Sequence, residues 1–214
     1  MKAFIFDMDG VIVDSEPLHS RTKLATFRHY GLDFDAAELV HYMGRTSRAL
    51  FGDVVRLENR SELDIREMID YKHALYLDIL RHDEAVQPVD GTRRLFAALA
   101  AAHIPAGLAS SAGRVVIEAV LEKFGLTGYF QSVLSGADLP ASKPDPAVYL
   151  LSAERLGVRP ADCVVLEDAA SGVAAAKAAG MFCIAYRNPN SGRQDLSRAD
   201  MVVEKIGEID ITRL

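Results

Sequence analysis

The sequence predicts an α/β fold in which a doubly wound parallel-sheet core carries an inserted all-helical cap domain. Short apolar runs alternate with helical patterns over most of the 214 residues, which is typical of a parallel sheet with crossover helices. One segment, residues 15–87, breaks this order because it contains helical patterns only. Polar side chains follow four of the predicted strands, at the sheet edge where open α/β folds bind their ligands.

The predicted strands are short apolar runs that stop at polar or turn-forming residues. The first run, A-F-I-F, stops at two aspartates separated by one residue. The strands are expected at Ala3–Phe6, Ala106–Ala109, Ser132–Leu134, Cys163–Leu166, Phe182–Tyr186 and Met201–Val203. The helices between them are expected at Gly91–Ala102, Arg114–Phe124, Ala147–Leu156 and Gly172–Ala179.

The cap domain is expected to consist of helices separated by glycines and polar turns. The helical patterns cover Leu18–Tyr30, Ala36–Tyr42, Ser47–Leu57 and Glu62–Leu80. Pro88 and Gly91 then mark the return to alternating strands and helices. We therefore expect residues 1–14 and 88–214 to form the α/β catalytic core and residues 15–87 to form the cap domain.

Composition argues against several classes of protein. A net charge of −6 and a pI near 5.5 argue against nucleic-acid binding, since such proteins carry basic patches. No apolar run reaches the roughly 18 residues of a membrane span, and no signal-peptide pattern precedes the first strand. Cys163 and Cys183 lie in apolar runs, where reduced core cysteines are expected. We expect a cytoplasmic monomer with no nucleic-acid or membrane partner.

The residues that follow the strands suit a cation and a phosphate group. Carboxylates at adjacent strand ends can hold Mg²⁺, which prefers oxygen ligands, and a lysine with hydroxyls beside it suits a phosphate. Each acidic residue alone could be an ordinary solvated loop side chain, but four strand ends point to one site. The residues are Asp7 and Asp9 after the first strand, Ser110 and Ser111 after the second, Lys143 in the loop after the third, and Glu167 and Asp168 after the fourth.

Asp7 and Asp9 indicate the kind of reaction. One carboxylate can attack phosphorus and form an aspartyl phosphate. A second carboxylate two residues later can act as general acid and then as general base. Gly10 allows a tight turn behind the pair, where a Cβ would crowd the phosphate, and the amides of that turn would add an anion-binding nest.

Four motifs carry a resemblance to a known family. They are D-x-D-G-V-x-x-D-S from Asp7 to Ser15, the serine after the second strand (Ser110), K-P-x-P from Lys143 to Pro146, and the pair Glu167-Asp168 with Gly172 behind it. In this order they resemble the haloacid-dehalogenase-like hydrolase superfamily, in particular its β-phosphoglucomutase-like subgroup with a helical cap. The resemblance covers essentially the whole chain and implies a Rossmann-like core.

The resemblance implies a role for each motif residue. Asp7 would be the nucleophile and Asp9 the acid/base, while Ser110 and Lys143 would hold the transferring phosphoryl group. The dehalogenases that name the family lack an acid/base at the position of Asp9, so phosphoryl transfer is favoured. The metal ligands would be Asp7, the backbone carbonyl of Asp9, Asp168, and Glu167 either directly or as an outer partner.

The cap residues that the resemblance marks would select the substrate. Lys72 interrupts an apolar helical stripe at positions 65, 68, 75 and 79, where it either extends along the helix to water or faces the substrate. His19 matches a histidine at the cap hinge. Gly44, Arg45 and Arg48 lie where the family has its specificity loop, and the arginines would either contact a sugar or second phosphate or be solvated.

Three functions stay open at this stage. We favour a Mg²⁺-dependent phosphatase that acts on a small phosphorylated metabolite, such as a sugar phosphate. The alternative is a β-phosphoglucomutase, although Ala112 and Gly113 stand where that enzyme's hydroxyl and cation are expected, which leaves Ser111 and Arg114 as the polar candidates of this loop. A non-catalytic phosphate sensor would not need an acid/base such as Asp9.

Overall fold

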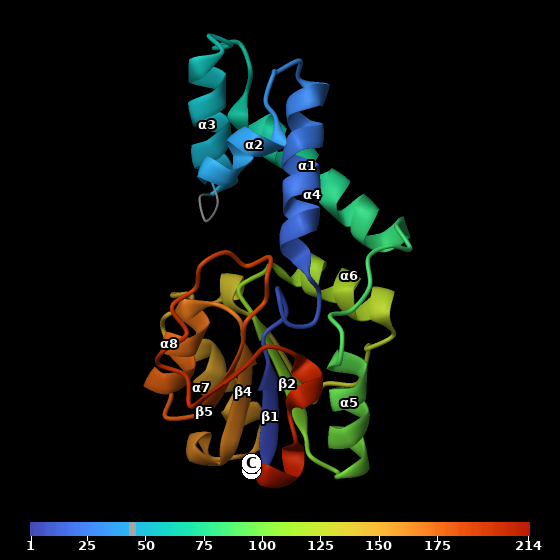
Figure 1. Cartoon of the computed structure of the whole chain (residues 1–214), viewed down its shortest axis with the longest axis vertical. Helices are drawn as coiled ribbons and strands as arrows, with labels where there is room; N and C mark the ends of the chain where they lie inside the picture. The colour runs from blue at the N-terminus through green and yellow to red at the C-terminus, as the bar shows by residue number, and fades with distance from the viewer. Residues whose placement is uncertain (43–45) are drawn as a thin grey trace. The chain divides into compact units, whose positions relative to one another are not determined.

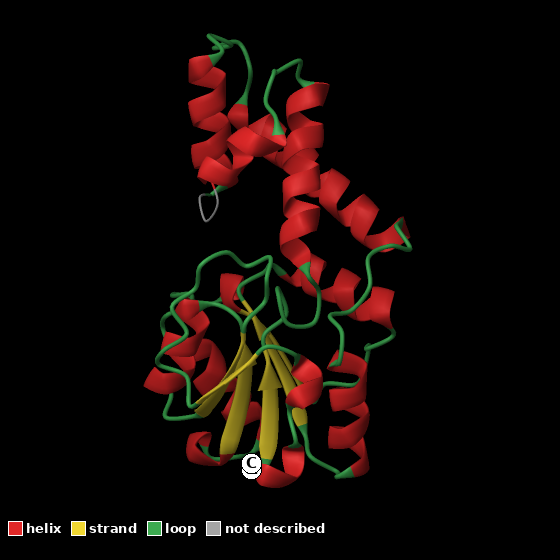
Figure 2. Ribbon diagram, in the orientation of Figure 1, coloured by secondary structure: helices red, strands yellow, loops and turns green. Residues whose placement is uncertain are grey.

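The computed structural model describes residues 1–42 and 46–214, which form two compact units. The α/β unit contains Met1–Asp14 and Ala85–Leu214, and the helical cap unit contains Ser15–Glu84. All strands of the described residues belong to the α/β unit, as Figures 1 and 2 show. The chain therefore leaves the α/β unit once, shortly after its first strand, and returns to it once.

The sheet has six parallel strands in the order β3-β2-β1-β4-β5-β6, which confirms the predicted doubly wound fold. Three strands extend one residue further than the apolar pattern predicts, to Ser110, Ser135 and Glu167. These polar residues continue the strands because Ser110 pairs with Ser135 and Glu167 pairs with Ala185. The bounds are β1 (Ala3–Phe6), β2 (Ala106–Ser110), β3 (Ser132–Ser135), β4 (Cys163–Glu167), β5 (Phe182–Tyr186) and β6 (Met201–Val203).

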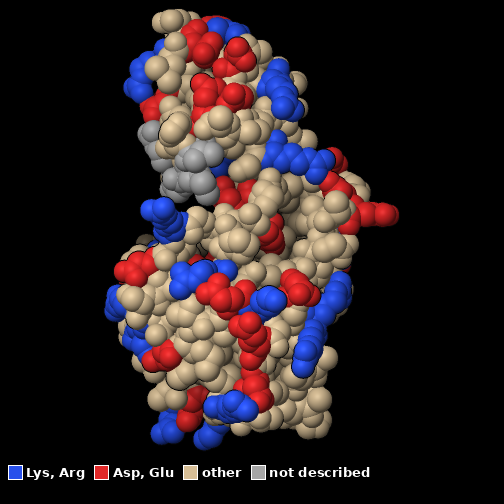
Figure 3. All heavy atoms as spheres, viewed as in Figure 1, with Lys and Arg blue, Asp and Glu red and all other residues tan. Residues whose placement is uncertain are grey.

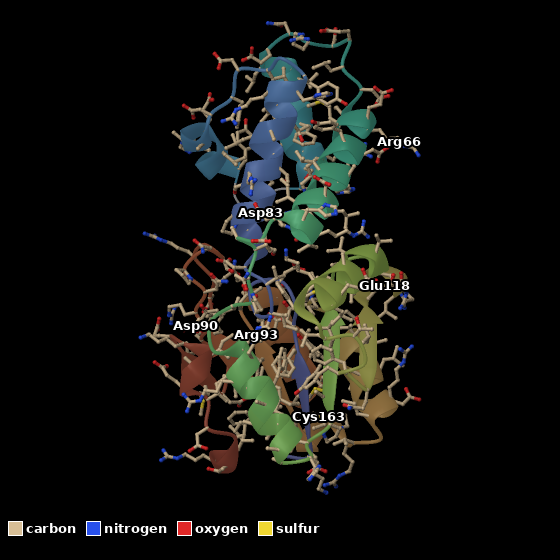
Figure 4. The ribbon with its side chains drawn as sticks, turned by 90° about the vertical axis from the view of Figure 1, so that its right-hand side faces the viewer. Arg66, Asp83, Asp90, Arg93, Glu118 and Cys163 are labelled. Carbon is tan, nitrogen blue, oxygen red and sulfur yellow. The ribbon has the colours of Figure 1, made fainter. Side chains whose placement is uncertain are left out.

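Helices cover both faces of this sheet (Figure 1). In Figure 4, Arg93 marks the helix of residues 92–101 and Glu118 marks the helix of residues 114–124. Short 3₁₀ turns lie at Gly136–Asp138, Pro160–Asp162, Ile206–Glu208 and Ile211–Arg213. The helices are α5 (Thr92–Ala101), α6 (Arg114–Phe124), α7 (Ala147–Leu156) and α8 (Ala170–Ala178).

Strand β1 supplies side chains to the cores on both faces because successive residues of a strand point to opposite sides. The ring of Phe6 lies 4.9 Å from that of Phe96 in α5 and 5.9 Å from that of Phe130. Ile5 belongs instead to the cluster that contains Tyr149 of α7. The first strand is therefore the centre of the fold, and the residues that follow it are held firmly.

The cap unit is a small helical bundle with its own core. Its helices are α1 (Ser15–His29), α2 (Ala36–Leu39) with a 3₁₀ turn at Val40–Tyr42, α3 (Ser47–Leu57) and α4 (Ile65–His82). Helix α4 begins at the N-cap Asp64, whose carboxylate accepts the amide of Arg66 at 2.7 Å. Phe27, Phe51 and Met68 are fully buried in the centre of the bundle.

The buried stripe of α4 differs from the predicted one. Met68 is buried as expected and Lys72 is buried beside it, but the buried row continues through Tyr76 and Leu80, while the predicted positions 65, 75 and 79 are only half-buried. The stripe follows a spacing of four because α1 packs along this row, where the His19 ring stacks on Tyr76 at 4.6 Å between centroids.

Other sequence expectations concern the cysteines and the surface. Cys163, labelled in Figure 4, and Cys183 are both buried and not joined in a disulfide. None of the helices that the structure describes is both long and apolar enough to cross a membrane. Figure 3 shows Lys and Arg side chains interspersed with Asp and Glu on the visible face.

Gly91, at the N-terminus of α5, should be essential for stability. Its φ is +85°, and an added Cβ would lie 2.5 Å from the backbone nitrogen of Gly207. We expect Gly91→Ala to lower the free energy of unfolding by about 2–4 kcal/mol, because a left-handed backbone is costly for alanine and the methyl group meets rigid backbone. Urea unfolding measures this change.

Gly207 provides the matched control on the other side of the same contact. An added Cβ there meets no atom within 4 Å, so Gly207→Ala should change the free energy of unfolding by less than about 1 kcal/mol. Equal losses in both variants would contradict the steric explanation.

Candidate active site

The candidate site lies where the strand order reverses. From β1 the chain passes to β2 and β3 on one side and then continues with β4 on the other side of β1. Crossovers that diverge in this way leave the carboxyl ends of the two central strands open to a ligand. Asp7 follows β1 and its amide donates to the carbonyl of Leu166 in β4 at 2.9 Å. Glu167 ends β4 and Asp168 follows it, so carboxylates from both strands meet at this point.

A buried lysine joins these acidic residues. Nζ of Lys143 lies 2.5 Å from Oδ1 of Asp7 and 2.8 Å from Oε1 of Glu167, and it donates to the carbonyl of Ala109 at 3.0 Å. None of the three charged side chains is more than 9% exposed. Isolated charges are costly to bury, so the three are stable there only as a group. Lys143 thereby fixes the position of the Asp7 carboxylate.

The carboxylate of Glu167 is surrounded by protein donors. Its Oε1 accepts the Lys143 ammonium and the hydroxyl of Tyr149, the latter at 2.7 Å. Its Oε2 accepts the amides of Asp168 at 2.9 Å and Ala169 at 3.1 Å. These contacts make Glu167 the anchor of Lys143.

Asp168 is held from two sides. Its Oδ2 accepts a hydrogen bond from the hydroxyl of Ser191, in the segment that follows β5. A Cβ added to Gly10, whose φ is +76°, would overlap the same oxygen. The glycine is therefore required for the close approach of Asp168.

Ser110 and Asp9 lie next to each other at the ends of β2 and β1. The hydroxyl of Ser110 is 3.5 Å from Oδ2 of Asp9 and accepts the amide of Ala112 at 3.0 Å. Ser135 donates its hydroxyl to the carbonyl of Ala112 at 2.8 Å and so fixes the same turn. The structure thus brings Asp7, Asp9, Ser110 and Lys143 together as the sequence predicts.

The electrostatics of the site indicate an excess of negative charge. Burial raises the pKa of Asp7 well above its ordinary value, although the Lys143 charge opposes this shift. Burial and the neighbouring Glu167 raise the pKa of Asp168 to about 7. Burial alone would lower the pKa of Lys143, but its ion pairs with Asp7 and Glu167 outweigh that effect and raise it. A further positive charge would therefore stabilise the site.

A metal ion fits this arrangement. One oxygen each from Asp7, Glu167 and Asp168 lie within 4.8 Å of one another. All the donors are carboxylate oxygens, the ligands that hard divalent cations prefer. The close approach of Gly10 to Asp168 keeps the two acidic turns near each other. The acidic cluster can therefore bind a divalent cation.

Two of the predicted substrate residues meet inside the cap unit. Nζ of Lys72 lies 3.3 Å from Nδ1 of His19 and 5.5 Å from the centroid of the Tyr76 ring. An ammonium group can only donate, so Nδ1 is the acceptor and the imidazole proton is on Nε2. Burial and the nearby charge of Lys72 lower the pKa of His19 to about 3, so the ring is neutral at neutral pH.

The remaining predicted residues are placed separately. Arg114, at the start of α6, pairs with Asp138 at 3.5 Å, and Ser111 is exposed. Arg48, on the first turn of α3, is exposed. Gly44 and Arg45 lie outside the described residues.

Sequence reasoning missed two residues of the site, Tyr149 and Ser191. Tyr149 is fully buried in the first turn of α7, six residues after Lys143, and nothing in its apolar surroundings marks it as a partner of Glu167. Ser191 could have been found by extending the search for polar residues to the end of the fifth strand.

Comparisons with known proteins agree with the fold. The haloacid dehalogenase-like hydrolase family matches residues 4–186. Fructose-1-phosphate phosphatase YqaB of Escherichia coli is 33% identical over 187 residues, which cover 86% of this chain and 95% of that protein. Hexitol phosphatase B of the same organism is 33% identical over 190 residues, covering 88% and 85%. The structure of a putative β-phosphoglucomutase from Thermotoga maritima matches with a TM-score of 0.84 at 28% identity, covering 97% and 96% of the two chains.

The chain therefore belongs to the haloacid dehalogenase-like hydrolase family. It is a phosphoryl-transfer enzyme of that family. Both the predicted family and the predicted enzyme class are confirmed.

The hydroxyl of Tyr149 should stabilise the site beyond its packing. Tyr149→Phe removes a hydrogen bond to a charged acceptor, so we expect the free energy of unfolding to fall by about 1.5–3 kcal/mol and kcat to fall as Lys143 becomes less fixed. Chemical unfolding and steady-state kinetics measure the two effects. Tyr129→Phe is the control, because the Tyr129 hydroxyl donates at 2.9 Å to the neutral carbonyl of Phe96. Tyr129→Phe should lower the free energy of unfolding by about 1 kcal/mol and leave kcat unchanged. A Tyr149→Phe enzyme with the same small loss of stability and full activity would contradict the prediction.

The raised pKa of Asp168 makes the stability of the metal-free protein depend on pH. Between the ordinary pKa of 3.8 and about 7, the folded state keeps a proton that the unfolded chain has released. Stability is therefore highest at low pH in this window and falls as pH rises. With EDTA present, the free energy of unfolding of wild type should fall between pH 5 and pH 7. In Asp168→Asn this fall should be smaller by about 2 kcal/mol, since each unit of pKa corresponds to about 1.4 kcal/mol. If the free energy of unfolding depends on pH equally in both proteins, Asp168 is not the group responsible.

Proposed function

We propose that the protein is a Mg²⁺-dependent phosphatase that hydrolyses a small sugar or polyol phosphate through an aspartyl phosphate on Asp7. The observation that carries the proposal is the buried ion pair between Lys143 and Asp7, with Nζ 2.5 Å from Oδ1. An ammonium group at this position can bind a phosphoryl oxygen while it holds the attacking carboxylate. The curated relatives fructose-1-phosphate phosphatase and hexitol phosphatase B support the class of substrate.

The residues of the α/β unit divide the reaction between them. Asp7 attacks phosphorus, and the bond from phosphorus to the ester oxygen breaks. Asp9 donates a proton to the departing oxygen and then accepts one from the water that hydrolyses the aspartyl phosphate. Lys143 and the hydroxyl of Ser110 bind the phosphoryl oxygens throughout. Asp9 thus ends each cycle in the protonated state in which it began, and free phosphate is the second product.

Asp7, Asp168 and the backbone carbonyl of Asp9 are the residues that would hold Mg²⁺, with Glu167 as an outer partner. The bound ion supplies positive charge that offsets the charge of the phosphoryl group. The raised pKa values of Asp7 and Asp168 support this assignment, because they reflect negative charge that the protein alone does not fully compensate.

We assign substrate recognition to residues outside this group. His19 and Lys72 form a polar pair in the cap unit, in which a neutral imidazole and an ammonium group can bind sugar hydroxyls or a phosphate. Arg48, Ser111 and Arg114 are the further candidates, as are Gly44 and Arg45 from the sequence.

A mutase of the β-phosphoglucomutase type is the second candidate, because a solved structure with that putative function matches this chain with a TM-score of 0.84. The turn after Ser110 favours hydrolysis over mutase activity. Ala112 and Gly113 carry no polar side chain, and Arg114 already pairs with Asp138. That turn offers fewer groups to hold a second phosphate.

A paired assay tests the proposal. Fructose 1-phosphate, hexitol phosphates and β-glucose 1-phosphate are supplied with Mg²⁺ and a trace of glucose 1,6-bisphosphate, and both phosphate and glucose 6-phosphate are followed. We expect phosphate release that EDTA abolishes. Glucose 6-phosphate formed faster than phosphate would identify a mutase instead, and no turnover of any substrate would favour a phosphate sensor.

Asp9→Asn tests the acid/base role directly. The substitution keeps the shape of the side chain but removes its proton transfer, so kcat should fall about 10²- to 10⁴-fold. Asp195→Asn is the control, since this exposed aspartate caps a turn at Ser197 elsewhere in the α/β unit. It should retain wild-type kcat, and an Asp9→Asn enzyme of equal activity would remove Asp9 from the mechanism.

A further inference from the structure

The segment that follows β5 is tied to both acidic turns of the site. The side-chain nitrogen Nδ2 of Asn188, a residue only 5% exposed, donates to the carbonyl of Gly10 at 2.9 Å. Gln194 accepts the amide of Ala170, at the start of α8, at 3.1 Å and donates to the carbonyl of Ser191 at 2.8 Å. The segment therefore bridges the turn after β1 and the turn after β4.

The same segment holds one oxygen of Asp168. The hydroxyl of Ser191 donates to Oδ2. Gly10 packs against this oxygen so closely that a Cβ would overlap it, whereas the same Cβ would lie 3.1 Å from Oδ1. Protein groups thus occupy the surroundings of Oδ2, and Oδ1 is the oxygen left to a cation.

We propose that Ser191 is a positioning residue of the metal site, which fixes the Asp168 carboxylate so that it offers a single oxygen and thereby favours Mg²⁺ over Ca²⁺. The inference rests on the proposed function in one respect, that a divalent cation binds at Asp7 and Asp168. It adds a determinant of which cation is accepted, supplied by a side chain that is not itself a ligand.

The physical reason lies in how the two cations are coordinated. Mg²⁺ requires near-octahedral geometry at short distances and takes one oxygen from each carboxylate, whereas Ca²⁺ is larger and accepts both oxygens of one carboxylate. A carboxylate whose Oδ2 is held by a hydroxyl cannot turn to offer both oxygens. Partners that orient a metal ligand typically change metal affinity by about 10- to 100-fold.

Calorimetric titration of the full-length, EDTA-treated protein with Mg²⁺ and with Ca²⁺ tests the proposal. Ser191→Ala removes the hydroxyl, so we expect Mg²⁺ to bind about tenfold more weakly and Ca²⁺ to bind equally well or better. The ratio of the two dissociation constants is the decisive quantity, because a general loss of structure would weaken both cations together.

Two further variants complete the test. Ser191→Thr keeps the hydroxyl and should restore the wild-type ratio. Ser197→Ala removes an exposed hydroxyl from the same connection between β5 and β6 and should leave both affinities unchanged.

The outcomes separate the inference from the proposed function. Wild-type binding of Mg²⁺ with an unchanged ratio in Ser191→Ala would overturn the role of Ser191 and leave the phosphatase proposal intact. A parallel loss for both cations would also overturn it. A wild-type protein that binds no Mg²⁺ would overturn the metal site of the proposed function and this inference together.

Discussion

The structure of the site depends on one buried cation, the ammonium group of Lys143. Asp7 and Glu167 come from neighbouring strands, and their carboxylates could not be buried together without positive charge between them. Nζ of Lys143 supplies that charge within 2.8 Å of both, although it lies 136 residues from Asp7 in sequence. The three groups can therefore be buried together, because the ammonium group of Lys143 offsets part of the negative charge of the two carboxylates.

Other features of the fold serve this ion group. Tyr149 and two backbone amides complete the contacts of Glu167, so that the anchor of Lys143 cannot turn away. Glycines stand at both acidic turns, where Gly10 admits the carboxylate of Asp168 and Gly172 admits that of Glu167; a Cβ at either would overlap the acid. Close packing of carboxylates thus accounts for both motif glycines, and Gly10 also has a left-handed backbone with φ +76°.

The separation of the chain into two units matches a separation of tasks. The α/β unit contains the groups that we assign to bond making and breaking, while the cap unit contributes the neutral His19 and the adjacent Lys72. Relatives in the same family include phosphatases for different phosphorylated compounds. In this chain the buried ion group lies wholly in the α/β unit, so the residues of the cap unit can change without disturbing it.

The sequence by itself determined the sheet, its helices and the residues at four strand ends, because apolar periodicity and the residues that interrupt it are local properties. The predicted strands β2, β3 and β4 end one residue too early. A strand continues as long as its backbone pairs with the neighbouring strand, even where the side chain is polar. Only the tertiary structure decided that Tyr149 and Ser191 belong to the site and that the stripe of α4 passes through Tyr76. These contacts join residues from distant segments and depend on how one helix or loop packs against another. Local sequence patterns do not predict such packing.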